Sequence, residues 1–173
     1  MKIRFIRATH EVTGSCTLLE VQNRYYLVDC GMEQGRDFFQ NISLPIPAGD
    51  IDAVFLTHAH IDHSGRVPLL VKEGFTGTIH ATRLTGQLLS VMLRDSAHIQ
   101  ESEAQWKNRK AARAGEQLVE PLYTVQDAQT ALSLFHPCRY GPVYDILDGV
   151  QIRFQDAGHL MGSASIYVTV EGK

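Results

Sequence analysis

One short segment, residues 52–63, limits the fold of this chain more than any other part of the sequence. It begins with the apolar run D-A-V-F-L, which is typical of a buried strand. It continues as T-H-A-H-I-D-H and so places three imidazoles and one carboxylate within six residues, namely His58, His60, Asp62 and His63. Such a density of metal-binding side chains is rare by chance. We therefore expect a fold whose loops carry a chemical site at the end of this strand.

The spacing of these side chains favours metal ions. His58 and His60 are two residues apart, so in extended or loop backbone they point the same way and reach one metal. If the chain then turns into a helix, Asp62 and His63 move toward a second position a few ångströms away. Zinc takes nitrogen and carboxylate ligands, and a catalytic zinc site keeps a position for water. Two zincs about 3.5–4 Å apart can share a hydroxide nucleophile and clamp the oxygens of a phosphate.

Two further positions fit the same site. The segment D-A-G-H-L-M-G-S, residues 156–163, ends an amphipathic strand with His159 between glycines, which supplies a third neutral nitrogen for the metal of His58 and His60. Asp29 ends the strand Y-Y-L-V-D and is placed to hydrogen-bond the second ring nitrogen of a ligating histidine. A turn or capping role for Asp29 is the alternative.

Around these motifs the pattern predicts strands, then helices mixed with strands, then strands again. Residues 66–73 have helical spacing, with Ser64 as the expected cap and Gly74 as the stop. Residues 88–114 are expected to form one or two projecting helices, either as a solvated face or as one wall of a substrate groove. Thr124 and Asp127 form a predicted capping box. The fold class expected is an α/β sandwich whose loops carry the site.

Composition narrows the class without fixing a substrate. The chain has 173 residues, of which 44% are hydrophobic and 20% charged, as in an ordinary globular domain. No apolar run reaches the roughly 20 residues of a membrane span, and we expect a cytoplasmic protein with no membrane partner. Three scattered cysteines (Cys16, Cys30 and Cys138) are expected to be small buried side chains, with a role near the metal as the alternative for Cys30. The net charge of −3 gives no global basic field, yet metal ions can supply the positive charge that a phosphate needs.

The order of these motifs resembles the first three motifs of the metallo-β-lactamase superfamily. Asp29 is followed by T-H-A-H-I-D-H at 57–63 and by D-A-G-H-L-M-G-S-A at 156–164. The wording of the third motif, together with E-V-T-G-S-C, D-S-A-H-I-Q-E at 95–101 and E-P-L-Y-T at 120–124, resembles the β-CASP branch of RNA-processing nucleases. The resemblance implies a metallo-β-lactamase αββα sandwich, and residues 1–173 would be the N-terminal portion of that domain. A metal-bridging aspartate and the β-CASP lobe would then follow Lys173.

The resemblance also implies a function. His58, His60 and His159 would hold one zinc, Asp62 and His63 part of a second, and Asp62 and His63 are assigned to catalysis. The expected reaction is hydrolysis of an RNA phosphodiester by a metal-bound hydroxide, with two Zn²⁺ per complete site. Single-stranded RNA is the expected partner, and a homodimer is a further expectation. These 173 residues alone are expected to have little or no nuclease activity.

Two other functions stay open. Glyoxalase II and lactonases share the HxHxDH core, so a hydrolase of small thioesters or lactones is one alternative. A non-catalytic scaffold of an RNA-processing complex is the other, although all five expected ligands are present here. His10 and His80 stand near strand ends and are expected at the surface or in the packing, with the border of the site as the alternative. For Ser15 and Ser163, a phosphate contact is the alternative to turn chemistry.

Overall fold

The computed structural model describes residues 1–9, 12–34, 43–147 and 149–172. Its centre is a six-stranded sheet, sheet A, in the order β1-β2-β3-β4-β5-β6. The first three strands are antiparallel, and β3 to β6 run parallel to one another. The strands are β1 (Lys2–Arg7), β2 (Cys16–Val21), β3 (Arg24–Val28), β4 (Ile51–Phe55), β5 (Thr78–Thr82) and β6 (Phe135–Cys138).

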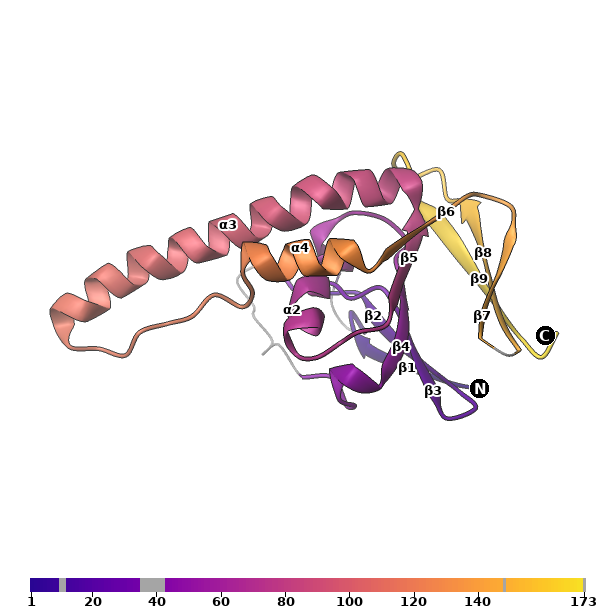
Figure 1. Cartoon of the computed structure of the whole chain (residues 1–173), viewed down its shortest axis with the longest axis horizontal. Coiled ribbons are helices and arrows are strands. Elements are labelled where there is room, and N and C mark those ends of the chain that lie inside the picture. The colour runs from indigo at the N-terminus through magenta and orange to yellow at the C-terminus, as the bar shows by residue number, and fades with distance from the viewer. Residues whose placement is uncertain (10–11, 35–42, 148, 173) are drawn as a thin grey trace.

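Helices cover one face of sheet A, and a second sheet covers the other (Figure 1). The helical elements are η1 (Ala48–Asp50), α1 (Ile61–Ser64), α2 (Val67–Lys72), α3 (Arg83–Ala114) and α4 (Val125–Ser133). Sheet B is the antiparallel meander of β7 (Val143–Leu147), β8 (Val150–Asp156) and β9 (Ala164–Val170). The described chain therefore forms an α/β/β stack.

Each interface of this stack has its own apolar core. Between sheet A and the helices, Leu27, Val54 and Leu56 meet Leu89 and Leu93 of α3. Between the two sheets, a second cluster joins side chains of both, namely Leu19, Val21, Tyr26, Ala53, Phe55, Cys138, Val150, Ile152, Phe154 and Ala164. Alternating side chains of β3 and β4 supply both clusters, as expected for strands buried on two faces.

The turns and caps follow the local sequence in most places. Gln22 and Asn23 connect β2 to β3 with φ values of 49° and 62°, which is the conformation of a tight hairpin turn. The capping box of Thr124 and Asp127 is present at the start of α4, so that prediction is confirmed. Pro45, Pro47 and the glycines predict an irregular loop over residues 31–49, and part of this stretch lies outside the described residues.

The predicted cap at Ser64 is wrong. Helix α2 has Arg66 at its N-cap position, and Ser64 is the last residue of the short α1 instead. The Ser64 hydroxyl donates to the carbonyls of Ala59 and His60, which ties α1 to the histidine segment. Gly74 follows α2 with a φ of 107°, in agreement with its predicted role as the stop.

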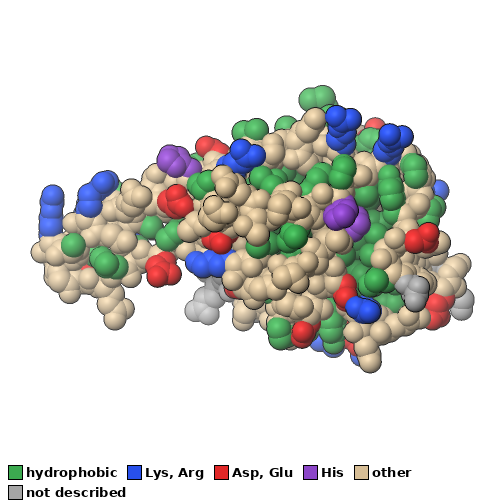
Figure 2. All heavy atoms as spheres, viewed as in Figure 1, with side chains coloured by type: hydrophobic (Ala, Val, Ile, Leu, Met, Phe, Trp, Pro, Cys, Tyr) green, Lys and Arg blue, Asp and Glu red, His purple; other side chains and the backbone are tan. Residues whose placement is uncertain are grey.

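The segment predicted as one or two helices is a single helix of 32 residues, α3. Its first half packs on the core, and its second half projects far beyond it before the chain returns (Figure 1). Near the tip, Lys110 lies 3.7 Å above the ring of Trp106, and the Asn108 side chain exchanges two hydrogen bonds with the backbone of Val119. Lys and Arg side chains gather at this tip (Figure 2). No helix in the described part of the chain is long and apolar enough to cross a membrane.

Candidate metal centre

The candidate centre lies where the parallel strands of sheet A end. Asp29 follows β3 directly, and Thr57 lies two residues beyond β4; these strands are neighbours, with Val28 opposite Phe55. The carboxyl ends of parallel strands meet at one edge of a sheet, so residues about 30 positions apart in sequence become neighbours. Sheet B reaches the same edge, since the Ala164 N–H donates to the Thr57 carbonyl (2.8 Å). Both sheets therefore deliver side chains to this place.

Three histidine nitrogens converge there. The Nδ1 atom of His60 lies 3.1 Å from Nε2 of His58 and 3.4 Å from Nε2 of His159. Within the described ranges, these three histidines form a group of possible metal ligands whose ligand atoms all lie within 4.8 Å of one another. The structure thus brings together residues 99 positions apart, as the two motifs predict.

The spacing of these nitrogens fits a tetrahedral ion. With metal–nitrogen bonds near 2.05 Å, two ligand atoms of a tetrahedron are about 3.3 Å apart. The separations of 3.1 and 3.4 Å bracket that value. Imidazole nitrogens are ligands that zinc accepts readily, so the donor set also fits in chemical type. His60 and His159 are exposed while His58 is buried, which leaves the centre open to solvent on one side.

Asp62 and His63 lie beside this group and not within it. Both belong to α1, whose helical turn brings the Asp62 carboxylate within 3.7 Å of Nε2 of His63. The rings of His63 and His58 have their centroids 4.1 Å apart. Asp62 and His63 therefore offer two adjacent donor atoms next to the three-histidine group.

Asp29 is the buried anchor of the site. Its backbone is in the left-handed conformation (φ 60°), which aspartate tolerates better than most residues, and its N–H donates to the Phe55 carbonyl (2.9 Å). Its carboxylate accepts a hydrogen bond from Nδ1 of His63 (2.7 Å) and from both the N–H and the hydroxyl of Thr57 (2.9 Å each). The Asp29 side chain thus touches a histidine in the way that the sequence leads us to expect.

Charge and burial act on two of the histidines in opposite directions. Burial, helped by the neighbouring His63, lowers the pKa of His58 to about 4, so its imidazole is neutral near pH 7 and has a lone pair for a metal. Burial also acts against protonation of His63. The hydrogen bond and the charge of Asp29, together with Asp62, outweigh it and raise the pKa of His63.

The loop that carries His159 is held by hydroxyl groups. The Ser163 hydroxyl accepts from the N–H groups of His159 (3.2 Å) and Leu160 (3.1 Å), so it serves the turn. The carbonyl of Gly162 accepts hydrogen bonds from the hydroxyls of Thr82 (2.6 Å) and Thr85 (2.8 Å) at the start of α3. Neither threonine stands out in the sequence, because nothing in their spacing connects them to a residue 80 or 77 positions away.

The other candidate side chains lie in simpler surroundings. His80 packs within sheet A, where its ring stacks on His136 and its Nε2 lies 2.8 Å from the Thr78 hydroxyl. Ser15 lies at the site, with its hydroxyl 3.4 Å from the Asp29 carboxylate. His10 falls outside the described residues. The three cysteines are buried and free, in agreement with their predicted packing role.

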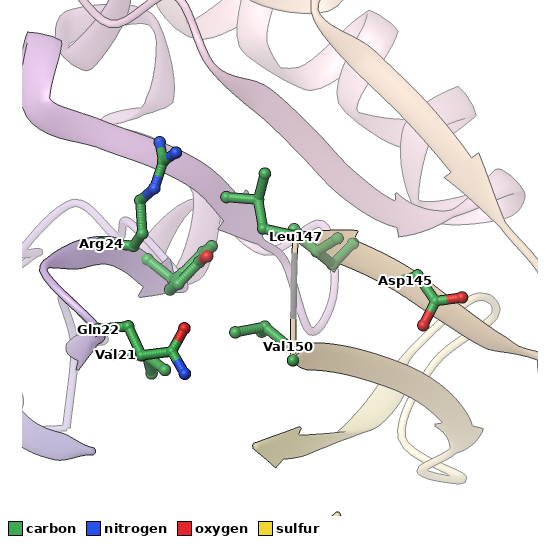
Figure 3. A pocket seen from close by; sticks show the side chains of 9 residues that line it. Val21, Gln22, Arg24, Asp145, Leu147 and Val150 are labelled. Carbon is green, nitrogen blue, oxygen red and sulfur yellow. The ribbon is translucent and has the colours of Figure 1, made fainter. Parts of the chain in front are cut away.

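A separate cavity of about 630 Å³ lies at another place in the sandwich. Figure 3 shows Val21, Gln22 and Arg24 of the β2–β3 hairpin on one side, facing Leu147 and Val150 of sheet B on the other. None of the described residues that line it is a candidate metal ligand. This cavity is a gap between the ends of the two sheets and takes no part in the histidine site.

Comparisons with known proteins show the family of this chain. Residues 11–169 match the family model of the metallo-beta-lactamase superfamily. Ribonuclease TTHA0252 of Thermus thermophilus is 36% identical over 177 residues, and the match covers all of this chain and 36% of the relative. Transcription termination factor FttA of Methanocaldococcus jannaschii is 28% identical, over 98% of this chain and 25% of the relative. The chain therefore spans about a third or less of these relatives.

Solved structures show the same fold. A metallo-beta-lactamase of Cronobacter sakazakii with a HARLDQ motif aligns with a TM-score of 0.53 at 17% identity, over 93% of this chain and 50% of that protein. The subclass B3 metallo-beta-lactamase MEM-A1, from a soil metagenome library, aligns with a TM-score of 0.54 at 16% identity, over 94% of this chain and 55% of that protein. With a family model that matches nearly its full length, the chain belongs to the metallo-beta-lactamase superfamily.

Proposed function

We propose that this chain carries the zinc-binding part of a β-CASP-type hydrolase that cleaves phosphodiester bonds of single-stranded RNA. The observation that carries the proposal is the convergence of His58, His60 and His159, whose ligand atoms all lie within 4.8 Å of one another, with His60 at tetrahedral spacing from the other two. The names of the relatives, a ribonuclease and transcription termination factors, support RNA as the substrate class.

In this proposal the residues of the site bind the metal, accept a proton and orient a ligand. His58, His60 and His159 hold one zinc, and Asp62 with His63 offers two donors toward a second. When bound, zinc supplies Lewis-acid chemistry, since it lowers the pKa of water and polarises a phosphoryl oxygen. The Asp62 carboxylate is partly exposed, so it can accept a proton from an attacking water. Asp29 keeps the His63 ring oriented through the hydrogen bond at Nδ1.

Metal binding is the first test, using the purified 173-residue chain. After chelation and dialysis against zinc, we expect about one tightly bound ion and a second, weaker one, because two donors hold less firmly than three. In the double variant His58→Ala, His60→Ala, zinc affinity should fall by more than about 100-fold, since loss of a mere outer partner of a ligand already costs roughly 10–100-fold. Metal content by mass spectrometry and binding by calorimetry measure this.

A matched control variant tests whether zinc affinity depends on the histidines of the site or on any histidine of the chain. His98 lies on α3, away from the centre, and His98→Ala should bind zinc as the unchanged chain does. Unchanged zinc affinity in the double variant would sink the proposed centre.

Substrate class is tested on the same preparations with labelled single-stranded RNA and, in parallel, a small thioester. We expect RNA cleavage by these 173 residues to be weak or absent, because the chain spans only about a third of its ribonuclease relative, and any cleavage to depend on zinc and to disappear in the double variant. Thioester hydrolysis without RNA cleavage would point instead to a glyoxalase II type of activity. RNA cleavage that persists in the double variant would contradict hydrolysis at this centre.

A further inference from the structure

The hydroxyl of Thr57 is the centre of a partly buried hydrogen-bond network beside the histidines. Its oxygen lies 2.9 Å from each carboxylate oxygen of Asp29 and 2.9 Å from Nδ1 of His58. Thr57 precedes the first histidine of the motif, so the backbone fixes its distance to His58. Among the described side chains, Thr57 contacts both the Asp29 carboxylate and a histidine of the three-histidine group.

The number of protons available determines how this network is arranged. An ionised carboxylate only accepts hydrogen bonds, and a threonine hydroxyl donates one and accepts others. The single Thr57 proton therefore goes to the Asp29 carboxylate, where the contact is charge-assisted and strong. The hydroxyl oxygen can then only accept from His58, which means that Nδ1 of His58 carries a hydrogen.

This arrangement fixes which nitrogen of His58 is free. A neutral imidazole with its hydrogen on Nδ1 has its lone pair on Nε2. Nε2 of His58 is the atom that lies 3.1 Å from Nδ1 of His60, within the three-nitrogen group. The opposite tautomer would turn an N–H toward the metal position and would leave the Thr57 hydroxyl without a donor on that side.

Asp29 acts on His63 directly and on His58 through Thr57. The carboxylate accepts from Nδ1 of His63 at 2.7 Å, which frees Nε2 of that ring as well. His58 does not reach the carboxylate by a hydrogen bond of its own among the described contacts; the hydroxyl fills the gap between them. Thus one buried charge sets the tautomers of two rings, one in each half of the candidate centre.

We propose that Thr57 is a positioning residue that passes the influence of Asp29 to His58 and holds His58 as the Nδ1–H tautomer, ready for a metal at Nε2. The link to metal binding rests on the proposed function, whereas the tautomer itself is a property of the metal-free chain.

The test compares Thr57→Val, which keeps the shape and removes the hydroxyl, with Thr57→Ser, which keeps the hydroxyl. Long-range ¹H–¹⁵N NMR of the histidine-labelled, metal-free protein reports the tautomer of each ring. We expect His58 to be the Nδ1–H form in the unchanged chain and in Thr57→Ser, and a mixture of tautomers in Thr57→Val. Zinc affinity should fall roughly 10–100-fold in Thr57→Val and recover in Thr57→Ser.

His63 is the internal control: the Thr57 hydroxyl lies 3.5 Å from its Nδ1, but that nitrogen bonds to Asp29 directly at 2.7 Å, so Nδ1 of His63 should keep its hydrogen in Thr57→Val. If Thr57→Val does not fold, Thr57→Ala gives the same comparison with a smaller side chain. An unchanged Nδ1–H signal of His58 in the hydroxyl-free variant overturns the proposal. If the unchanged chain binds no zinc while the tautomers respond as expected, the metal centre fails and the hydroxyl relay stands.

Discussion

His80 is a histidine whose titration is set by packing and not by a ligand. Burial, together with the neighbouring ring of His136, lowers its pKa to about 4. Its ordinary pKa in an unfolded chain is about 6.5. Between these values the unfolded state binds a proton that the folded state does not, so stability is lost as the pH falls from about 6.5 toward 4.

We therefore predict that the metal-free chain loses stability on acidification from pH 7 to pH 5, and that His80→Gln loses less. One proton accounts for at most about 1.4 kcal/mol per pH unit. Urea unfolding in the presence of a chelator at pH 7, 6 and 5 measures the slope. His98→Gln on α3 is the control and should keep the slope of the unchanged chain; equal slopes for His80→Gln and the unchanged chain would contradict the prediction.

The identities of the candidate ligands were predictable from sequence, and their supports were not. The dense motif at 58–63 is a local pattern whose side-chain chemistry favours a metal, and the glycine-flanked His159 becomes a candidate ligand when it is read together with that motif. The role of the Thr57 hydroxyl follows from its contacts with Asp29 and His58 and from the contact of Asp29 with His63, which only the three-dimensional structure shows. Local spacing states which residues are near in the chain, and tertiary structure decides which atoms touch.

The His159 loop and helix α3 are coupled through a glycine. Gly162 has a φ of 88°, and a Cβ there would lie 2.7 Å from the N atom of Thr85 and 2.9 Å from Cβ of Leu84. We predict that Gly162→Ala displaces the loop and weakens zinc binding, as measured by calorimetry. Gly158→Ala is a matched control, because Gly158 is also left-handed (φ 65°) but has no atom within 4 Å of that position.

Both substitutions carry the same backbone cost, about 1–2 kcal/mol for a left-handed residue. The difference between them therefore isolates the steric contact with α3. An equal loss of zinc affinity in the two variants would show that backbone strain, and not the contact, controls the loop.

The capping box of α4 gives a simpler prediction for stability. Thr124 accepts from the N–H of Asp127, and the Asp127 carboxylate accepts from the N–H of Thr124 (2.8 Å). Thr124→Ala should lower the free energy of unfolding by about 1 kcal/mol. Chemical denaturation measures this, with Thr130→Ala within the same helix as the control; no difference between the two variants would contradict the cap.

Helices and strands were predictable where the side-chain pattern is strong. Strand β6 had no such pattern: it contains Pro137, and a strand with proline is tolerated because β6 lies at the edge of sheet A. The predicted cap at Ser64 failed because the hydroxyl bonds backward to Ala59 and His60 instead of forward into α2. Competing hydrogen bonds of this kind depend on how the preceding loop folds.

Across the whole chain, the three-histidine group connects the two sheets. His58 and His60 follow β4 of sheet A, whereas His159 lies between β8 and β9 of sheet B. We predict that zinc raises the free energy of unfolding by about 2.7 kcal/mol at 100 times its dissociation constant, since it binds the folded state. Thermal unfolding with and without a chelator measures this, and His159→Ala should lose most of the gain.

The layered architecture followed from the order of strand and helix patterns, and the superfamily resemblance drawn from the motifs is confirmed by the family model. The contacts between sheets were not readable from sequence. Thr57 meets Ala164 and Thr82 meets Gly162 across 107 and 80 positions, respectively, and no periodicity encodes such pairs. They arise from the stacking of two sheets whose shared core forms only in the folded chain.

The chain's single tryptophan is at the tip of α3, with Lys110 above its ring. At 1.5 Å per residue, Trp106 lies about 30 Å along the helix from Thr85, which holds the His159 loop. We therefore expect its intrinsic fluorescence to change when the projecting end of α3 unfolds and to stay unchanged when an ion binds at the histidine site. A zinc titration that follows tryptophan emission would then show no change in intensity even if the protein binds zinc tightly.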